Sequence, residues 1–265
     1  MNLPEFERVI YKCNPLIEVI CQLRFPPILK ISHEEPVDFQ DKIRLHYPLF
    51  ETTRTQIPAE LSKFVQQFDL PLQSDIAYNF KSEDQRWNLT LTKDFIALST
   101  SSYERYEQYK QRFSIALDIF DRIYKPSFYS RLGLRYKDLI IRSKLGFESR
   151  EWSDLIAKRF ASELHDEELS SSIQGIAKNL TLKSENIQVN LNHGLVTIKE
   201  SQDSNEETAY LIDADFFSEQ KIEGNENVWN VLDQFNRSAG RLFRWSITEI
   251  LHDALQPQPI DARKD

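Results

Sequence analysis

The fold is decided by one continuous stretch, residues 103–138, which reads YERYEQYKQRFSIALDIFDRIYKPSFYSRLGLRYKD. Its first part predicts a helix over residues 103–124, because aromatic and aliphatic side chains recur every three or four positions. Pro126 ends this helix, since proline cannot continue it. The second part predicts a strand over residues 128–142, because apolar and cationic side chains alternate there. An amphipathic helix that leads into a long strand indicates a sheet with helices packed on one face.

The residues before this stretch predict more of the same sheet. Residues 16–25 alternate apolar and polar side chains, which indicates a half-buried strand that Pro26 and Pro27 stop. Further elements are expected as a helix at about 37–47, an irregular connection with a short helical piece at 51–74, and strands at 76–81, 86–92 and 95–100. The order of strand, helix, strands, helix and strand is typical of a ferredoxin-like sheet.

The residues after the stretch predict a second set of elements. We expect a helix at 152–160, strands at 173–184, 186–199 and 208–217, and a long helix from about 226 to 255. The turn-forming sequence Asn192-His193-Gly194 punctuates the middle strand or splits it into a hairpin. The prediction is therefore an α+β protein. Residues 1–145 are expected to form a ferredoxin-like half, 146–257 a helix, three-stranded meander and long helix, and 258–265 a disordered tail. One continuous domain is the alternative.

Composition narrows the functional classes. The chain has 265 residues, a net charge of −8 and only 6 glycines. Phosphate-cradling loops need glycine, and the sequence holds neither the dinucleotide-binding nor the P-loop motif, so we expect no nucleotide cofactor. A negative surface repels polyphosphate at long range, which disfavours general nucleic-acid binding.

The sequence gives no sign of export or of a membrane span. The N-terminal residues lack the layout of a signal peptide, and no apolar run approaches the roughly 18 residues of a spanning helix. Cys13 and Cys21 are too few and too poorly placed for a disulfide framework. These features predict a cytoplasmic protein.

Four segments carry a resemblance. They are Asn14-Pro15-Leu16-Ile17-Glu18-Val19, with Leu23 to Pro26; Leu91 to Asp94, with Leu98 to Thr100 and Tyr103; Arg131 to Tyr136; and Leu242-Phe243 with Ile247-Thr248. In order and spacing the chain resembles an uncharacterised family of sporadically distributed bacterial proteins of about this length. That resemblance implies a patchy distribution typical of mobile or defence-associated genes, and it implies no catalytic residues.

A cationic sheet face is the first candidate site. Arg131, Arg135 and Lys137 lie on one face of their strand, because strand side chains alternate with a period of two. If the strands pair as predicted, Arg24 and Arg86 join them in an anion or nucleic-acid site. The commoner outcome for this pattern is a solvated sheet face with cross-strand ion pairs.

Two carboxylates form the second candidate site. Asp213 and Asp215 share one strand face and suggest a Mg²⁺ site or a catalytic base. Acidic residues on an exposed strand more often only discourage edge pairing. The five histidines show no zinc-binding spacing, and His193 is expected in a turn.

Aromatic residues form the third candidate site. Tyr103, Tyr106 and Tyr109 fit the core stripe of their helix better than a stacking surface. Trp229 and Trp245 lie off the main stripe of the last helix, which suggests a contact with a protein partner or a second copy.

These observations lead to three functional hypotheses. The first is a non-enzymatic interaction protein that oligomerises or docks on a protein partner, as a component of a bacterial defence or toxin–antitoxin-like system. The second is an anion or nucleic-acid binder that uses the basic sheet face. The third is a metal-dependent enzyme that uses Asp213 and Asp215.

Overall fold

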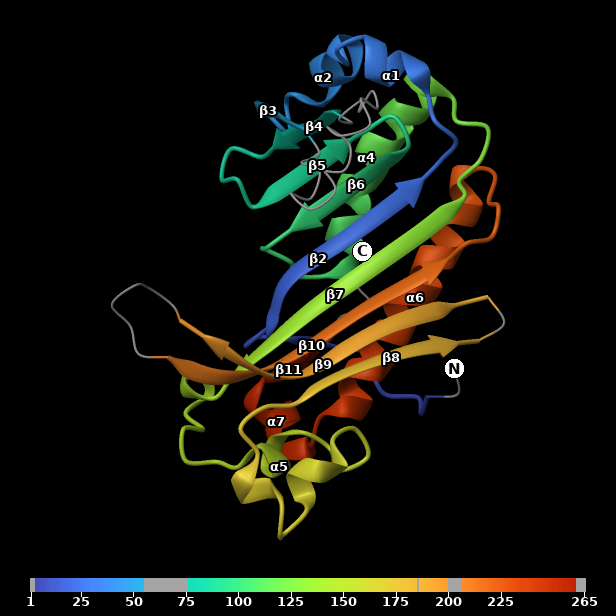
Figure 1. Ribbon diagram of the computed structural model, residues 1–265. Helices are drawn as coiled ribbons and strands as arrows, with labels where there is room; N and C mark the ends of the chain where they lie inside the picture. Colours follow the sequence, from blue (N-terminus) through green and yellow to red (C-terminus); the bar gives the residue numbers. More distant parts are fainter. Residues whose placement is uncertain (1–2, 55–75, 185, 200–205, 261–265) are drawn as a thin grey trace, which may run out of the picture.

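A computed structural model describes residues 3–54, 76–184, 186–199 and 206–260 of the chain. Its main feature is a nine-stranded sheet with the long helices behind it (Figure 1). In chain order the elements are β1 (Val9–Tyr11), β2 (Leu16–Arg24), α1 (Leu29–His33), α2 (Val37–Ile43), β3 (Leu49–Arg54), β4 (Ile76–Lys81), β5 (Trp87–Leu91), β6 (Phe95–Thr100), α4 (Tyr106–Tyr124), β7 (Arg131–Ile141), α5 (Trp152–Leu155), β8 (Ala177–Lys183), β9 (Gln188–Ile198), β10 (Glu207–Ser218), α6 (Asn225–Ser246), α7 (Glu249–Ala254) and β11 (Pro257–Pro259).

The sheet is antiparallel throughout, in the order β3-β4-β5-β6-β2-β7-β10-β9-β8. This arrangement confirms the predicted α+β class with an antiparallel sheet backed by helices. In the first half, α1 and α2 follow β2, and α4 connects β6 to β7. The α4 crossover from β6 to β7 encloses one antiparallel strand, β2, and the order β5-β6-β2-β7 is the ferredoxin-like order, which β4 and β3 extend at the edge of the sheet.

The second half repeats the plan of the first. Each half has one central strand, then a three-stranded meander, then a long helix: β2, β4-β5-β6 and α4 in one, β7, β8-β9-β10 and α6 in the other. Outward from the β2–β7 pair, the neighbours are β6, β5 and β4 on one side and β10, β9 and β8 on the other. The sheet therefore has approximate two-fold symmetry about the β2–β7 pair, and it runs without a break across residue 145.

The core lies between the sheet and its two long helices. Side chains of β2 and β7 that face the helices are buried, as are those on the inner face of α4. Burial of this apolar surface is the main driving force for the layered arrangement. The core-facing residues include Val19, Cys21, Leu23, Leu132, Leu134, Tyr106, Tyr109, Phe113, Leu117 and Phe120. The predicted tyrosine stripe of α4 thus lies largely in the core.

Two predicted helices are shorter than expected for a shared reason. The helix predicted at 152–160 ends with α5, and the helix predicted at 226–255 is divided into α6 and α7. Ile156 and Ile247 are both extended and form a β-bridge to each other. Thr248 then begins α7, and its hydroxyl accepts a hydrogen bond from the Leu251 N–H at 3.3 Å. A contact between distant parts of the chain therefore overrides the local helical pattern.

The predicted interruption of β9 is wrong. The strand runs through residues 192–194, and Gly194 (φ +154°) lets it pass close to the preceding segment. A Cβ atom at Gly194 would lie 1.9 Å from the carbonyl oxygen of Ile176. His193 is consequently buried in the strand rather than placed in a turn, and burial lowers its pKa to about 4.

Three further expectations are corrected at the strand ends. Ile17 is 44% exposed, because the β2–β7 register shifts there and places the residue in a bulge. Residues 257–259 form β11, which pairs with β1, instead of belonging to a disordered tail. The expected irregular connection begins with strand β3, and residues 55–75 lie outside the described residues. None of the helices in the described ranges combines the length and the apolar character needed to cross a membrane.

Candidate functional site

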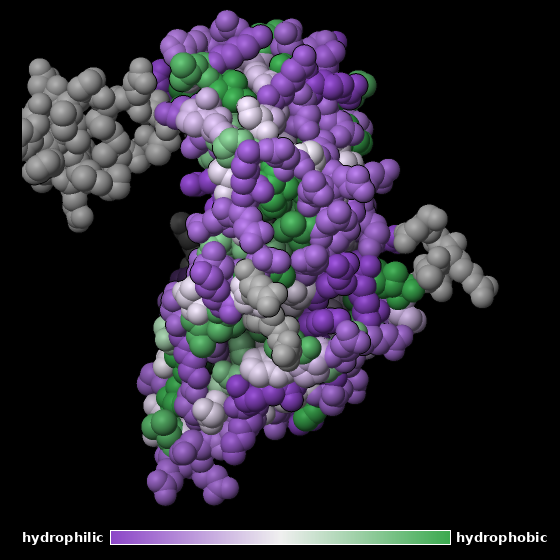
Figure 2. Space-filling view, turned by 90° about the vertical axis from the view of Figure 1, so that its right-hand side faces the viewer, coloured by the Kyte–Doolittle hydropathy of each residue, from purple (hydrophilic) through white to green (hydrophobic). Residues whose placement is uncertain are grey.

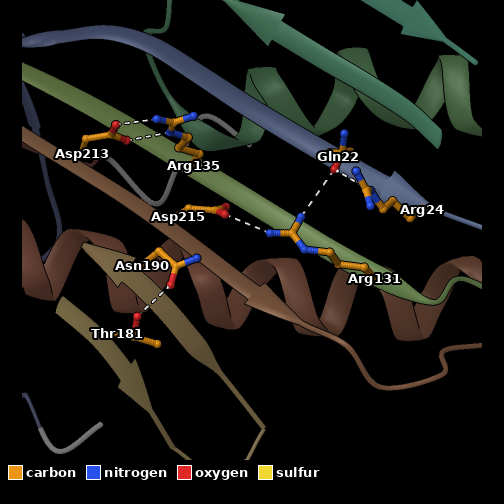
Figure 3. Close-up of polar contacts among 8 residues, drawn as sticks. All are labelled: Gln22, Arg24, Arg131, Arg135, Thr181, Asn190, Asp213 and Asp215. Carbon is orange, nitrogen blue, oxygen red and sulfur yellow. Dashed lines mark hydrogen bonds and ion pairs between the residues drawn. The ribbon is translucent and has the colours of Figure 1, made fainter. Parts of the chain in front are cut away.

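The sheet face opposite the long helices carries most of the predicted cations (Figure 3). Arg135 donates from Nε and Nη2 to the two carboxylate oxygens of Asp213, at 2.7 and 2.5 Å. Arg131 donates to Asp215 at 2.9 Å, and Lys137 pairs with Glu18 at 2.7 Å. The cause is the pairing of β7 with β10 and β2, which brings acidic residues beside each cation on the same face.

Arg24 also lies on this face, but Arg86 does not join the group. Arg24 is exposed and sits directly opposite Arg131, and both guanidinium groups donate to the side-chain oxygen of Gln22, at 3.3 and 3.5 Å. Arg86 immediately precedes β5, and its carbonyl accepts a hydrogen bond from Ser101, which follows the C-terminal end of β6. Arg24 instead pairs with Phe95, at the opposite end of β6. The predicted cationic cluster is therefore a balanced set of ion pairs with one exposed arginine.

The two predicted metal-binding carboxylates are held by the same pairs. Asp213 and Asp215 each bind a guanidinium group, as Figure 3 shows. Burial raises the pKa of Asp215, and its neighbour Arg131 opposes that change. In the part of the chain that the structure describes, no group of three His, Cys, Asp or Glu side chains is arranged to hold a metal ion.

The two tryptophans proposed for a protein interface make contacts within the chain. Trp229 meets the edge of Phe113 at a centroid distance of 6.2 Å, and Lys110 lies over its ring. Trp245 meets Phe160 at 6.1 Å. Both rings are partly buried against the core. The side of the molecule shown in Figure 2 is mainly hydrophilic, with hydrophobic residues gathered in small patches. The partner contact of these tryptophans remains a prediction.

A cavity that the sequence did not predict lies on the helix-facing side of β7 and β10. Its volume is about 280 Å³. It is enclosed by the sheet, the beginning of α4, the C-terminal half of α6 and the N-terminal segment that contains β1. Aromatic side chains form much of the wall: Tyr11, Tyr103, Tyr106, Tyr136, Phe216 and Phe243.

Asp138 of β7 lines this cavity and is only 7% exposed. Within the described residues, no hydrogen bond or ion pair reaches its carboxyl group. Burial, with a smaller contribution from the Asp213 carboxylate across the sheet, raises the pKa of Asp138 to about 8. A buried carboxyl group without a partner is costly and uncommon in folded proteins.

The polar groups around the cavity are committed to other partners. The Tyr136 hydroxyl donates to Asn236 at 3.0 Å, and the Tyr106 hydroxyl donates to Asp233 at 2.9 Å. The Tyr11 hydroxyl is hydrogen-bonded to Nδ1 of His252 at 2.8 Å. These three hydroxyls are therefore hydrogen-bonded to groups other than Asp138.

Three of the five arginines in the described lining of the cavity are engaged in the same way. Arg8 pairs with Glu107 at 2.6 Å, and Arg241 pairs with Glu5 at 2.7 Å. Arg244 binds Glu249 and also lies over the ring of Phe6, 5.3 Å from its centroid. These pairs hold the N-terminal segment over the cavity and leave the Asp138 carboxyl without a counter-ion.

The local sequence explains how Asp138 comes to line the cavity. It occupies a helix-facing position of β7, in register with Leu16 of β2 and Ile212 of β10. The side chain of Asn14 fixes the start of β2, because its oxygen accepts the Leu16 N–H at 3.1 Å and its amide donates to the Tyr103 carbonyl at 3.0 Å. All four segments that carry the family resemblance reach this cavity, through Asn14, Leu16, Tyr103, Tyr136, Leu242 and Phe243.

Sequence reasoning missed Asp138 although a signal was present. In the alternation of β7, the buried positions are Leu132, Leu134, Tyr136, Asp138 and Ile140. An acidic residue at an apolar position of a strand is the pattern that identifies a buried carboxyl.

Comparisons with known proteins add no family. No protein-family model matches the chain, and no curated protein matches it. The family resemblance of the four segments therefore stays a prediction.

Proposed function

We propose that this protein is a non-catalytic binding protein that holds a small organic molecule in the cavity behind β7. The observation that carries this proposal is the buried Asp138 carboxyl, which has no partner among the described residues. A fold gains stability when such a group is paired or replaced, so an unpaired one is expected where a ligand supplies the partner.

The size and lining of the cavity support a small ligand. Its volume of about 280 Å³ lies near the lower end of the roughly 300–1,000 Å³ typical of small-molecule sites. Most of the exposed wall is apolar, and its polar groups include the buried Asp138 carboxyl, which is the usual composition of a binding pocket. Serine, cysteine and histidine are missing from the described lining, so a non-catalytic role accounts for the groups present.

A fragment screen tests the proposal. Ala239 of α6 lines the cavity and is 9% exposed, so Ala239→Leu places three more carbon atoms in the ligand's space. Ser238→Leu adds a leucine to the same helix outside the cavity lining and is the matched control. Ligand-observed NMR should find fragments that bind wild type and Ser238→Leu but not Ala239→Leu, with circular dichroism confirming that all three are folded. Absence of any such fragment would overturn the proposal.

The open sheet face supports a second candidate function, docking of a protein partner in the cytoplasm. Its ion pairs are already formed, so a partner could cover the face without isolating a charge. Arg24, exposed and opposite Arg131, is the group most available to an acidic partner. Sedimentation and pull-down with Arg24→Glu test this function. Nucleic acid that is recovered with wild type, and lost with added salt, would instead favour the nucleic-acid hypothesis.

A further inference from the structure

We infer that the ligand of the cavity is an organic cation, whose protonated amine pairs with Asp138 while its apolar body lies against the aromatic wall. This inference rests on the proposed function, because it assigns the chemistry of the molecule that the same cavity holds. The geometry carries it in three steps: the position of the carboxyl, the aromatic rings around it, and the pairing of several nearby donors with other groups.

Asp138 is the acidic group of the buried wall. The other carboxylates of the cavity lining, Glu7 and Glu104, are exposed at its rim. Asp138 lies instead on the sheet, where β2, β7 and β10 meet in register. A ligand that enters the cavity therefore meets one negative or protonated oxygen pair at the inner end and apolar surface along its length.

The rings are arranged in two corners that suit a cation. Tyr103 and Tyr136 meet edge to face, with centroids 5.8 Å apart and planes at 90°. Tyr11 and Phe243 meet at 5.6 Å and 70°. The faces of aromatic rings attract ammonium groups, most strongly where water is excluded, and a carboxylate beside them adds the counter-charge.

Several donors of the lining are already bound to other groups, and the exposed Arg237, which also lines the cavity, makes no ion pair with Asp138 among the described residues. The hydroxyl groups of Tyr11, Tyr106 and Tyr136 bond to His252, Asp233 and Asn236. Arg8, Arg241 and Arg244 are paired with Glu107, Glu5 and Glu249. A ligand amine can therefore bind Asp138 without breaking any existing ion pair.

The pH dependence of the binding affinity distinguishes a cationic ligand from a neutral one. The pKa of Asp138 is raised to about 8, so at neutral pH the empty site is mostly protonated. An amine needs the ionised form, so its affinity should rise about 50-fold from pH 6 to pH 8, with release of a proton. A neutral ligand that accepts a hydrogen bond from the protonated acid should instead bind more weakly above pH 8.

Other titratable groups face the cavity from every element that packs around it. Their protonation also contributes to the pH dependence that is measured. They are Glu7, Arg8 and Tyr11 from the N-terminal segment, Tyr103, Glu104, Arg105 and Tyr106 at the start of α4, Tyr136 on β7, Asp213 across the sheet, Arg237, Arg241 and Arg244 on α6, and His252 on α7. His252 is the one whose usual pKa lies in the tested range, and burial together with Arg244 lowers its pKa. The pKa of His252 is therefore shifted away from that of Asp138, which is raised.

Matched amine and alcohol pairs test the inference. Calorimetry would compare 2-phenylethylamine with 2-phenylethanol, cyclohexylmethylamine with cyclohexylmethanol, and 4-phenylbutylamine with 4-phenylbutanol at pH 6, 7 and 8. Two buffers of different ionisation enthalpy report the released proton. We expect the amines of at least one pair to bind about tenfold or more tightly than the alcohol, and Asp138→Asn to remove that advantage.

Asp121→Asn is the matched control variant. Asp121 is also a partly buried carboxyl of raised pKa, but it accepts a hydrogen bond from Tyr129 at 2.7 Å and does not line the cavity. It should keep the amine preference. Alcohols that bind as well as the amines, an amine preference that survives in Asp138→Asn, or no binding by any amine of the panel would each overturn the inference. If the fragment screen still finds neutral ligands lost in Ala239→Leu, the cavity function stands and only the cationic class fails.

Discussion

The two faces of β7 hold charged groups in opposite states. On the open face, Arg131, Arg135 and Lys137 each meet a carboxylate. On the helix-facing side, the next residue, Asp138, meets none among the described residues. One strand thus pairs its charges on the open face and leaves one unpaired where it faces the cavity. Stability favours the first arrangement, so the second indicates a site kept for binding.

The largest expected effect comes from removing the unpaired charge. Folding raises the pKa of Asp138 from about 3.9 in an unfolded chain to about 8. The folded protein binds the extra proton between these values, so wild type loses stability as the pH rises from about 4 to about 8. Asp138→Asn should therefore raise the free energy of unfolding by about 5 kcal/mol at pH 8 and by little at pH 4. Urea denaturation at both pH values measures this, and a variant less stable than wild type at pH 8 would contradict it.

The second prediction removes the cation of one ion pair on the open face. A carboxylate there is then left unpaired, as Asp138 is on the helix-facing side. Arg135→Ala leaves Asp213, whose side chain is 8% exposed, without its bidentate partner. The loss should be about 2 kcal/mol at pH 7, a value reduced because the Arg135 side chain is 38% exposed and the pair is partly screened.

Asp213→Ala is the matched partner variant, and it should cost less, since Arg135 can be hydrated where it lies. Urea denaturation of both variants at pH 7 checks this comparison; a loss in Asp213→Ala as large as that in Arg135→Ala would refute the expectation that the unpaired carboxylate causes most of the loss.

The third prediction separates helix stability from cavity electrostatics. Gly240 lies in α6 at the cavity, and a Cβ atom there would meet no atom within 4 Å. Gly240→Ala should therefore raise the free energy of unfolding by about 1 kcal/mol, because alanine is the better helix former. Unlike Asp138→Asn, it should do so equally at pH 4 and pH 8. A pH-dependent gain would show that the substitution acts through the cavity.

The smallest effect is expected at Arg24. This side chain is exposed and its only hydrogen bond is a long one to Gln22, so Arg24→Ala should change the free energy of unfolding by less than about 0.5 kcal/mol. Thermal unfolding of Arg24→Ala and of Arg135→Ala under the same conditions compares the two losses of stability. A loss as large as that of Arg135→Ala would mean that the charges of the open face act as one network.

Local pattern was enough to predict most elements of the fold. The alternation of residues 16–25 and 128–142, and the helical repeat of residues 103–124, lie in the sequence itself and need no distant contact. The Ile156–Ile247 bridge could not be predicted this way, because it joins residues that are far apart in the chain. It shortened one predicted helix and divided another.

The candidate site shows the same limit. A period of two correctly placed Arg131, Arg135 and Lys137 on one face. Alternation also placed Asp213 and Asp215 together, but it could not show that β10 would pair with β7 and turn two expected metal ligands into partners of arginines. Strand neighbours follow from tertiary packing rather than from local pattern.

The approximate two-fold symmetry of the sheet has an evolutionary consequence. Its arrangement is the one expected from tandem duplication of an ancestral unit, with the seam at β2 and β7. The long helices of the two halves have diverged. Near its C-terminal end α4 packs Phe120 against Phe25, with centroids 4.8 Å apart, whereas α6 presents Ala239 and Gly240 to a hollow. Tyr106 at the start of α4 also lines this hollow, so a duplication of this kind would place the cavity at the boundary between the two copies.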